Sequence, residues 1–70
     1  MNLYAVTADY RPSNPNKPVY YVLAVSRAEA KRIFQSRISW LKIYDVALID
    51  DETRKQEIIN DPRHHIVLRG

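Results

Sequence analysis

The sequence predicts a small α+β domain in which one antiparallel-rich sheet carries a helix packed on one of its faces. Segments of β-branched and aromatic residues at 3–10, 19–25 and 43–49 are typical of strands. A capped, amphipathic segment at residues 27–39 separates the second strand from the third and predicts a helix. The expected element order is β-β-α-β-(α)-β, with a second helix and a fourth strand near the C-terminus.

The length of the chain limits it to a single α+β domain, residues 1–70. A core of this size rarely contributes more than roughly 3–5 kcal/mol of stability without a disulfide, a metal or an oligomer. The chain has no cysteine, which excludes disulfides and thiolate metal sites. Oligomerisation or a tight partner is therefore the remaining source of additional stability.

Three features predict a cytoplasmic protein. The N-terminal residues 1–4 contain neither the basic nor the apolar region of a signal peptide. No apolar run approaches the roughly 20 residues that span a bilayer, so we expect no membrane partner. The absence of cysteine fits a reducing compartment.

The proline-rich segment 11–18 predicts a loop between the first two strands. It contains three of the four prolines, and proline lacks the amide donor that a sheet requires. Together with its flanking strands, this loop predicts an antiparallel hairpin with a long connection.

Capping residues mark the start of both predicted helices. The Ser26 hydroxyl can accept a hydrogen bond from the amide of Glu29, whose carboxylate can reach back to the amide of Ser26. The acidic run 50–52 and Thr53 can cap a second helix that ends near Asn60, and residues 66–68 predict the fourth strand. The apolar stripe of the first helix consists of Ala30, Ile33, Phe34, Ile38 and Leu41.

The two faces of the sheet follow from the alternation of strand residues. The predicted face toward the first helix consists of Tyr4, Val6, Ala8, Tyr20, Val22, Ala24, Tyr44, Val46 and Leu48. The predicted opposite face consists of Leu3, Ala5, Val19, Tyr21, Leu23, Val25, Ile43, Ala47 and Ile49. This second face is too apolar to face water. Either residues 52–70 fold over it, or it is the interface of a homodimer or another partner; a wrong strand assignment is the third explanation.

The sequence offers no basis for catalysis. It has no cysteine nucleophile, and none of its serines stands in a G-x-S-x-G context. The only glycine is Gly70, which excludes a glycine-rich phosphate loop. His64 and His65 are neighbours on a predicted strand and should point to opposite faces. We expect a non-enzymatic protein with no catalytic residue, no metal and no cofactor.

The charge and the aromatic content are compatible with nucleic acid as a partner. The chain has 11 Lys and Arg against 8 Asp and Glu, a formal net charge of +3. Arg27, Lys31 and Arg32 lie toward the solvent side of the first helix and, with exposed tyrosines, suit single-stranded nucleic acid. Neither an aromatic RNP motif nor a GXXG loop is present. The alternative is that these charges only keep the protein soluble.

Protein binding is the other interpretation of the surface. Tyr, Trp and Arg are enriched at interface hot spots, and a proline-stiffened loop presents side chains at a lower entropy cost. Alternatively, the proline-rich loop 11–18 is an ordinary connection between two strands. Trp40, in turn, can fill the seam between the first helix and the sheet instead of contacting a partner. The candidate partner-binding residues are Tyr10, Arg11, Lys17, Tyr21, Leu23, Arg27, Lys31, Arg32, Arg37 and Trp40.

The stretch V-L-A-V-S-R-A-E-A (residues 22–30), continuing to Phe34 and followed by residues 43–49, is similar in layout to small phage-encoded proteins. In these, a looped hairpin leads into a helix entry of the pattern A-x-S-x-x-E-A and a returning strand. Over residues 3–50 the chain resembles the inhibitor of host RNA polymerase of T7-like phages and several small anti-CRISPR proteins. It departs from them in its basic charge and its C-terminal segment. The resemblance implies a stoichiometric inhibitor that blocks a host protein or ribonucleoprotein complex in the host cytoplasm, but it assigns no role to an individual residue.

Overall fold

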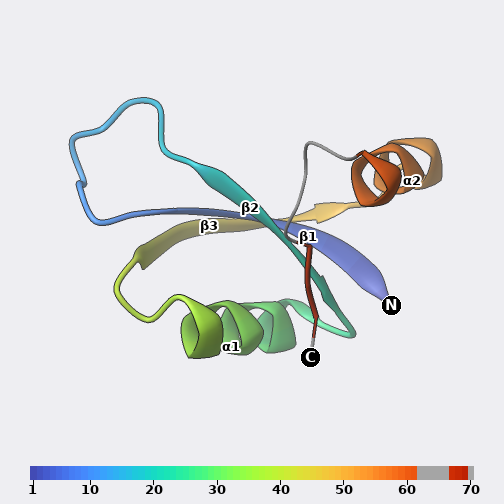
Figure 1. Cartoon of the computed structure of the whole chain (residues 1–70), viewed down its shortest axis with the longest axis horizontal. Coiled ribbons are helices and arrows are strands. Elements are labelled where there is room, and N and C mark those ends of the chain that lie inside the picture. Colours follow the sequence, from blue (N-terminus) through green and yellow to red (C-terminus); the bar gives the residue numbers. More distant parts are fainter. Residues whose placement is uncertain (62–66, 70) are drawn as a thin grey trace.

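The computed structural model describes residues 1–61 and 67–69 and shows a four-stranded mixed sheet with two helices (Figure 1). The predicted α+β class and element order are confirmed. Of the residues discussed above, His64, His65, Ile66 and Gly70 lie outside the described residues. In chain order the elements are β1 (Asn2–Asp9), β2 (Val19–Ala24), α1 (Arg27–Arg37), β3 (Lys42–Ile49), α2 (Glu52–Asn60) and β4 (Val67–Arg69).

The connections between the strands explain why the helices lie on opposite faces of the sheet. The strand order is β3-β1-β2-β4; β1 is antiparallel to β2 and β3, and β4 is parallel to β2. Helix α1 therefore connects the parallel strands β2 and β3, whereas α2 connects β3 back to β4 in the other lateral direction. Crossovers between parallel strands are right-handed. Because the two crossovers run across the sheet in opposite directions, their helices must lie on opposite faces of it. Figure 1 shows α1 below the sheet and α2 above it.

Helix α1 begins with the predicted cap. The Ser26 Oγ accepts a hydrogen bond from the amide of Glu29 at 3.1 Å. The Glu29 carboxylate accepts from the amide of Val25 at 3.4 Å, one residue earlier than predicted. The helix ends at Arg37, two residues earlier than expected. One residue before this end, the Ser36 hydroxyl donates to the carbonyl oxygen of Ile33 at 2.8 Å, a local bond that competes with helix propagation.

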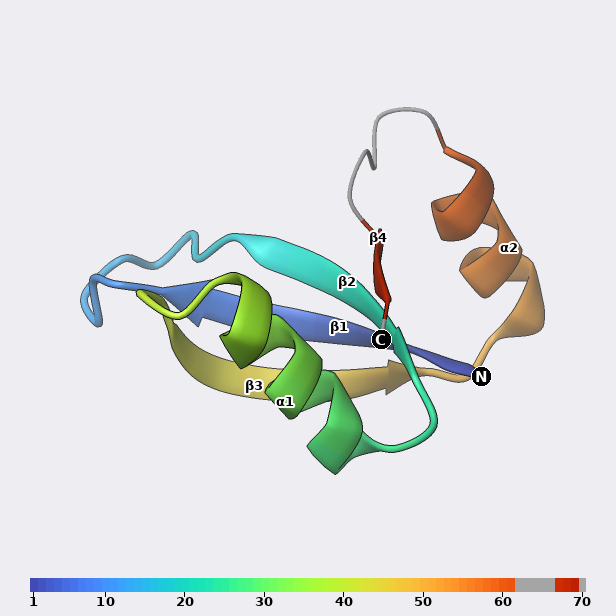
Figure 2. The same ribbon diagram turned by 60° about the horizontal axis from the view of Figure 1, so that its bottom comes forward.

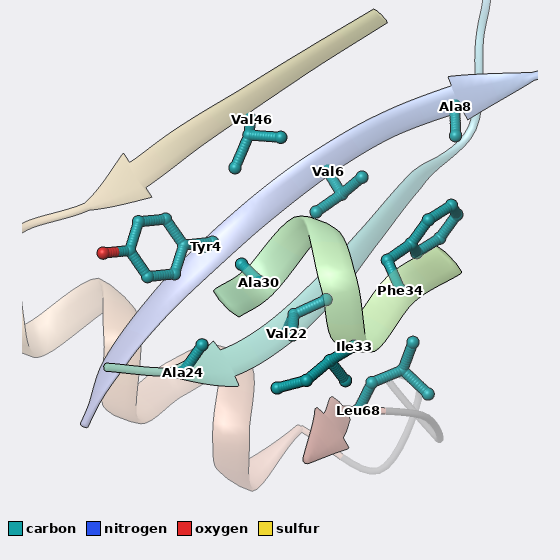
Figure 3. Packing of buried hydrophobic residues seen from close by; sticks show 10 residues of the cluster. All are labelled: Tyr4, Val6, Ala8, Val22, Ala24, Ala30, Ile33, Phe34, Val46 and Leu68. Atoms are coloured by element: carbon teal, nitrogen blue, oxygen red, sulfur yellow. The ribbon is translucent and has the colours of Figure 1, made fainter. Parts of the chain in front are cut away.

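The main core lies between α1 and the sheet, where Phe34 is fully buried. Its ring centroid lies 5.2 Å from that of Tyr20, with the rings tilted by 56°. Leu68 of β4 joins this core, so the short last strand also contributes to it. The buried cluster consists of Tyr4, Val6, Ala8, Val22, Ala24, Ala30, Ile33, Phe34, Val46 and Leu68 (Figure 3).

A bulge in β3 changes the predicted faces of this strand. Thr7 pairs with Asp45 but Ala8 pairs with Ile43, so Tyr44 is an extra residue in β3. The prediction that Tyr44 belongs to the core was therefore wrong: its side chain is 37% exposed. Ile43, predicted on the second face, instead packs against the α1 core because it pairs with a residue of that face.

Leu48 is the other predicted core residue of the sheet that is exposed. It pairs with Tyr4 and therefore lies on the α1 face as expected. However, β3 is an edge strand, and the Leu48 side chain remains 44% exposed.

Helix α2 covers one end of the second sheet face. The cap comes from the predicted run 50–53: the Asp51 carboxylate accepts from the amides of Thr53 and Arg54. Ile58 is buried and packs in a second cluster with Leu3 and Leu23. The prediction that the C-terminal segment folds over this face is thus confirmed for this end.

The other end of the second face is uncovered by the described residues. Val19, at the start of β2, is 48% exposed, and Asp45 is exposed on the same face. Val25, predicted on this face, lies beyond the end of β2 and is exposed.

Candidate binding site

A cleft of about 410 Å³ lies where the β1–β2 loop meets the segment between α1 and β3. Both segments lie at the end of the molecule that is remote from α2 (Figures 1 and 2). The volume is in the range of ligand pockets in proteins. The cleft is lined by Ala8, Asp9, Tyr10, Arg11, Pro18, Tyr20, Ile38, Trp40 and Leu41.

Asp9, the last residue of β1, organises the loop beside the cleft. Its side chain is almost completely buried. One carboxylate oxygen accepts hydrogen bonds from the amides of Tyr10 at 2.7 Å and Arg11 at 3.2 Å. The other accepts from the Asn14 side-chain amide at 2.7 Å. These bonds fix the backbone that carries Tyr10 and Arg11.

The ionised form of Asp9 is the one that makes these bonds. The hydrogen bond from Asn14 lowers the pKa of the Asp9 carboxyl below its ordinary value of 3.8, and the amides of Arg11 and Tyr10 lower it further. Burial opposes this by raising the pKa, but it is outweighed. The carboxylate therefore remains charged, and its bonds remain formed, at neutral pH.

The second half of the loop is held by Lys17. Its Nζ donates to the carbonyl oxygens of Pro12 at 3.1 Å and Asn14 at 2.7 Å. The amide of Asn16 also donates to the Asn14 side-chain oxygen at 3.0 Å. The expectation of a stiff loop thus has a physical basis in side-chain hydrogen bonds as well as in its prolines.

Two large aromatic side chains stand exposed at the cleft. Tyr10 is 67% exposed and Trp40 is 72% exposed. The Arg11 guanidinium carbon lies 5.1 Å from the centre of the Tyr10 ring, within cation–π range. The alternative prediction for Trp40, that it fills the seam between helix and sheet, does not agree with this exposure.

The structure brings three of the ten candidate residues together at this cleft, namely Tyr10, Arg11 and Trp40. Lys17 lies in the same loop, but its Nζ is 4.9 Å from the Tyr44 ring centre rather than at the cleft. Leu23 is buried beneath α2, so its side chain belongs to the core and is not available to a partner.

The remaining candidates lie elsewhere. Tyr21 is partly buried and packs against the cluster formed by Ile58, Leu3 and Leu23. Arg27, Lys31 and Arg32 are exposed on α1, where Arg32 lies 3.7 Å from the Glu29 carboxylate. Arg37 donates to the carbonyl oxygen of Arg69 at 3.2 Å and so connects α1 to β4.

Asp9, Asn14 and Tyr20 are parts of the site that the sequence analysis missed. The signal for the first two was available, since an Asp at a strand end before an Asn-containing loop is typical of side-chain-capped turns. Tyr20 was assigned only to the core. It is half-buried, which leaves part of its side chain to line the cleft.

A second depression, of about 560 Å³, follows the outer side of α2. Its lining residues are all exposed and none is aromatic, so it presents no rigid anchor for a partner. They are Glu52, Thr53, Gln56, Glu57 and Asn60.

Comparisons of the chain with protein-family models, curated proteins and solved structures find no match. Within residues 1–61 and 67–69, no group of three or more His, Asp or Glu side chains is placed to hold a metal ion. The described helices are also too short or too polar to cross a bilayer. The interpretation of the cleft therefore depends on its own geometry.

Proposed function

We propose that the protein is a non-enzymatic binding module that recognises another protein through the cleft beside Tyr10, Arg11 and Trp40. The observation that carries this proposal is the exposure of Trp40 and Tyr10 at a concave surface. Aromatic residues and arginine dominate the binding energy of interfaces when they enter a partner's pocket. An exposed tryptophan beside a cleft is suited to that role.

The hydrogen bonds of the loop favour tight rather than adaptive binding. Asp9, Asn14 and Lys17 hold the loop through bonds that exist before any partner arrives. A partner then does not have to order this backbone, so less of the interaction energy is lost as conformational entropy.

The basic surface of α1 has a secondary role in this proposal. Arg27, Lys31 and Arg32 are exposed on a convex helix and do not line the cleft. Such peripheral charges accelerate the encounter with an acidic partner more than they hold the complex together.

The inhibitor role rests on the resemblance of residues 22–34 and 43–49 to phage-encoded proteins. In this proposal the domain acts as a phage or mobile-element inhibitor, comparable to an anti-CRISPR protein, that occupies a surface of a host protein or ribonucleoprotein complex. The mechanism is steric blockade and requires no chemistry of its own.

Single-stranded nucleic acid is the second candidate partner, and one observation favours it. The three cation–π contacts of the described residues all lie toward the loop end of the sheet: Arg11 with Tyr10, and Lys17 and Lys42 with Tyr44. Alternating cations and aromatic rings suit phosphates and bases. A strong fall in oligonucleotide affinity between about 50 and 200 mM salt would support this alternative.

Capture from a bacterial lysate, followed by mass spectrometry, tests the leading proposal. The wild-type protein should recover a stoichiometric protein partner, and Tyr10→Ala/Trp40→Ala should lose it. The control Val25→Ala removes an exposed apolar side chain at the other end of α1. It should retain the partner. Recovery of nucleic acid alone, or loss of the partner in the control only, would overturn the proposal.

A further inference from the structure

Strand β3 is a long, unpaired edge of the sheet. Among the described residues it pairs only with β1, and it has eight residues, whereas β4 at the other edge has three. An edge strand presents backbone N–H and C=O groups that can pair with a strand of another chain. The β3 edge is therefore the surface of this fold that is best able to extend the sheet.

The part of β3 after the Tyr44 bulge is regular. Val46 and Leu48 pair with Val6 and Tyr4 and lie on the α1 face. Leu48 is 44% exposed there, an unusually open leucine next to a buried core. The residues between and beside them, Asp45, Ala47 and Ile49, alternate onto the other face.

We propose that two copies of the chain associate by antiparallel pairing of their β3 strands about a two-fold axis at Ala47. This register places Leu48 of each copy beside Val46 of the other on the same face of a continuous sheet. Directly opposed residues of antiparallel strands must share a face, and Val46 and Leu48 do so. The exposed surface of Leu48 is then covered.

The charges at the two ends of β3 identify a second copy as the partner. Lys42 begins the strand, and the acidic residues Asp50, Asp51 and Glu52 follow it. Antiparallel self-pairing brings Lys42 of each copy near the acidic segment of the other, whereas parallel self-pairing would juxtapose like charges. Asp51 already caps α2, and the Glu52 carboxylate accepts a hydrogen bond from the Gln56 side-chain amide, so among the described residues Asp50 is the acidic partner left for Lys42.

The bulge limits the size of this interface. It interrupts regular pairing before Ile43, which leaves residues 45–49 as the ladder. Such a ladder buries less than the roughly 1,000 Å² of a stable interface, so the dimer should be weak and concentration-dependent. Because a two-fold interface uses the β3 edge of both copies and β4 is short, the assembly closes at two chains.

Sedimentation velocity between about 10 µM and about 1 mM protein tests the proposal. The wild-type protein should shift from monomer to dimer across this range. Leu48→Lys places an ammonium group beside Val46 of the other copy and should remain monomeric throughout. The matched control is Val19→Lys, a residue of similar exposure on the uncovered part of the opposite face; it should dimerise like the wild type.

A charge exchange provides the second arm of the test. Lys42→Glu should weaken the dimer about tenfold, since it affects two symmetric contacts. Adding Asp50→Lys should restore it, and far-UV circular dichroism should show that all variants fold. A wild-type protein that stays monomeric would overturn the proposal. So would a dimer that Val19→Lys disrupts and Leu48→Lys does not, or a charge exchange that fails to restore pairing.

Discussion

Ile58 is the residue through which α2 covers the second face of the sheet. It is 6% exposed and packs against Leu3 and Leu23, which are also buried. The Ile58→Ala substitution removes three carbon atoms from this contact. At about 0.8 kcal/mol per buried methylene, the lost transfer free energy alone is about 2.4 kcal/mol. The cavity left behind raises the expected loss of unfolding free energy to about 3 kcal/mol.

This loss is large for a chain of 70 residues. At about 0.05–0.15 kcal/mol per residue, the whole free energy of unfolding is about 3.5–10.5 kcal/mol. The entropy of unfolding, at about 2.1 cal/mol/K per residue, is about 0.15 kcal/mol/K for the chain. A loss of about 3 kcal/mol therefore lowers Tm by about 20 °C.

Urea unfolding followed by far-UV circular dichroism measures this change. The control is Val25→Ala, an exposed apolar residue, which should change the free energy of unfolding by about 0.5 kcal/mol or less. If Ile58→Ala were no more destabilising than Val25→Ala, α2 would not be part of the cooperative core, and the second face would need another cover.

Three further predictions concern the loop, the cleft and the first helix. Folding lowers the pKa of the Asp9 carboxyl. Its contribution to the free energy of unfolding is therefore fully present above pH 3.8, and it is lost as the pH falls through the lower pKa that Asp9 has in the folded protein. Urea titrations across this range should therefore show an acid-induced loss in the wild type that is smaller in Asp9→Asn; equal losses would contradict the role of Asp9. Trp40, the sole tryptophan, should be quenched by iodide nearly as well in the native as in the unfolded protein, whereas a protected, blue-shifted emission would contradict its exposure. Ser26→Ala should reduce the free energy of unfolding by about 1 kcal/mol, because it removes the cap of α1. The control Ser13→Ala, in an exposed loop, should leave the free energy of unfolding nearly unchanged. Equal effects of the two substitutions would argue against the cap.

The elements with local signals could be predicted from the sequence. Ser26 and Asp51 cap their helices as expected because a cap depends on residues within one turn. The apolar stripe of α1, with Phe34 at its centre, follows from the helical period alone. The placement of α2 over Leu3 and Leu23 was foreseen only as one of several explanations, because it depends on the lateral direction of the β3–β4 connection.

The features that sequence reasoning missed depend on how separate segments meet. The bulge at Tyr44 results from the register of β3 against β1, and no local pattern in β3 marks it. The exposure of Leu48 follows from the edge position of its strand. The cleft combines Tyr10 and Trp40, which are distant in sequence and come together only once α1 has packed on the sheet.

We propose that the cleft beside Tyr10, Arg11 and Trp40 is the surface that binds a protein partner. The most direct measurement is a titration of the captured partner with the wild-type protein, Trp40→Ala and the control Val25→Ala. A hot-spot truncation costs at least about 2 kcal/mol, so Trp40→Ala should raise the Kd about 30-fold or more, while Val25→Ala leaves it unchanged. An unchanged Kd for Trp40→Ala would show that the partner binds elsewhere on the protein.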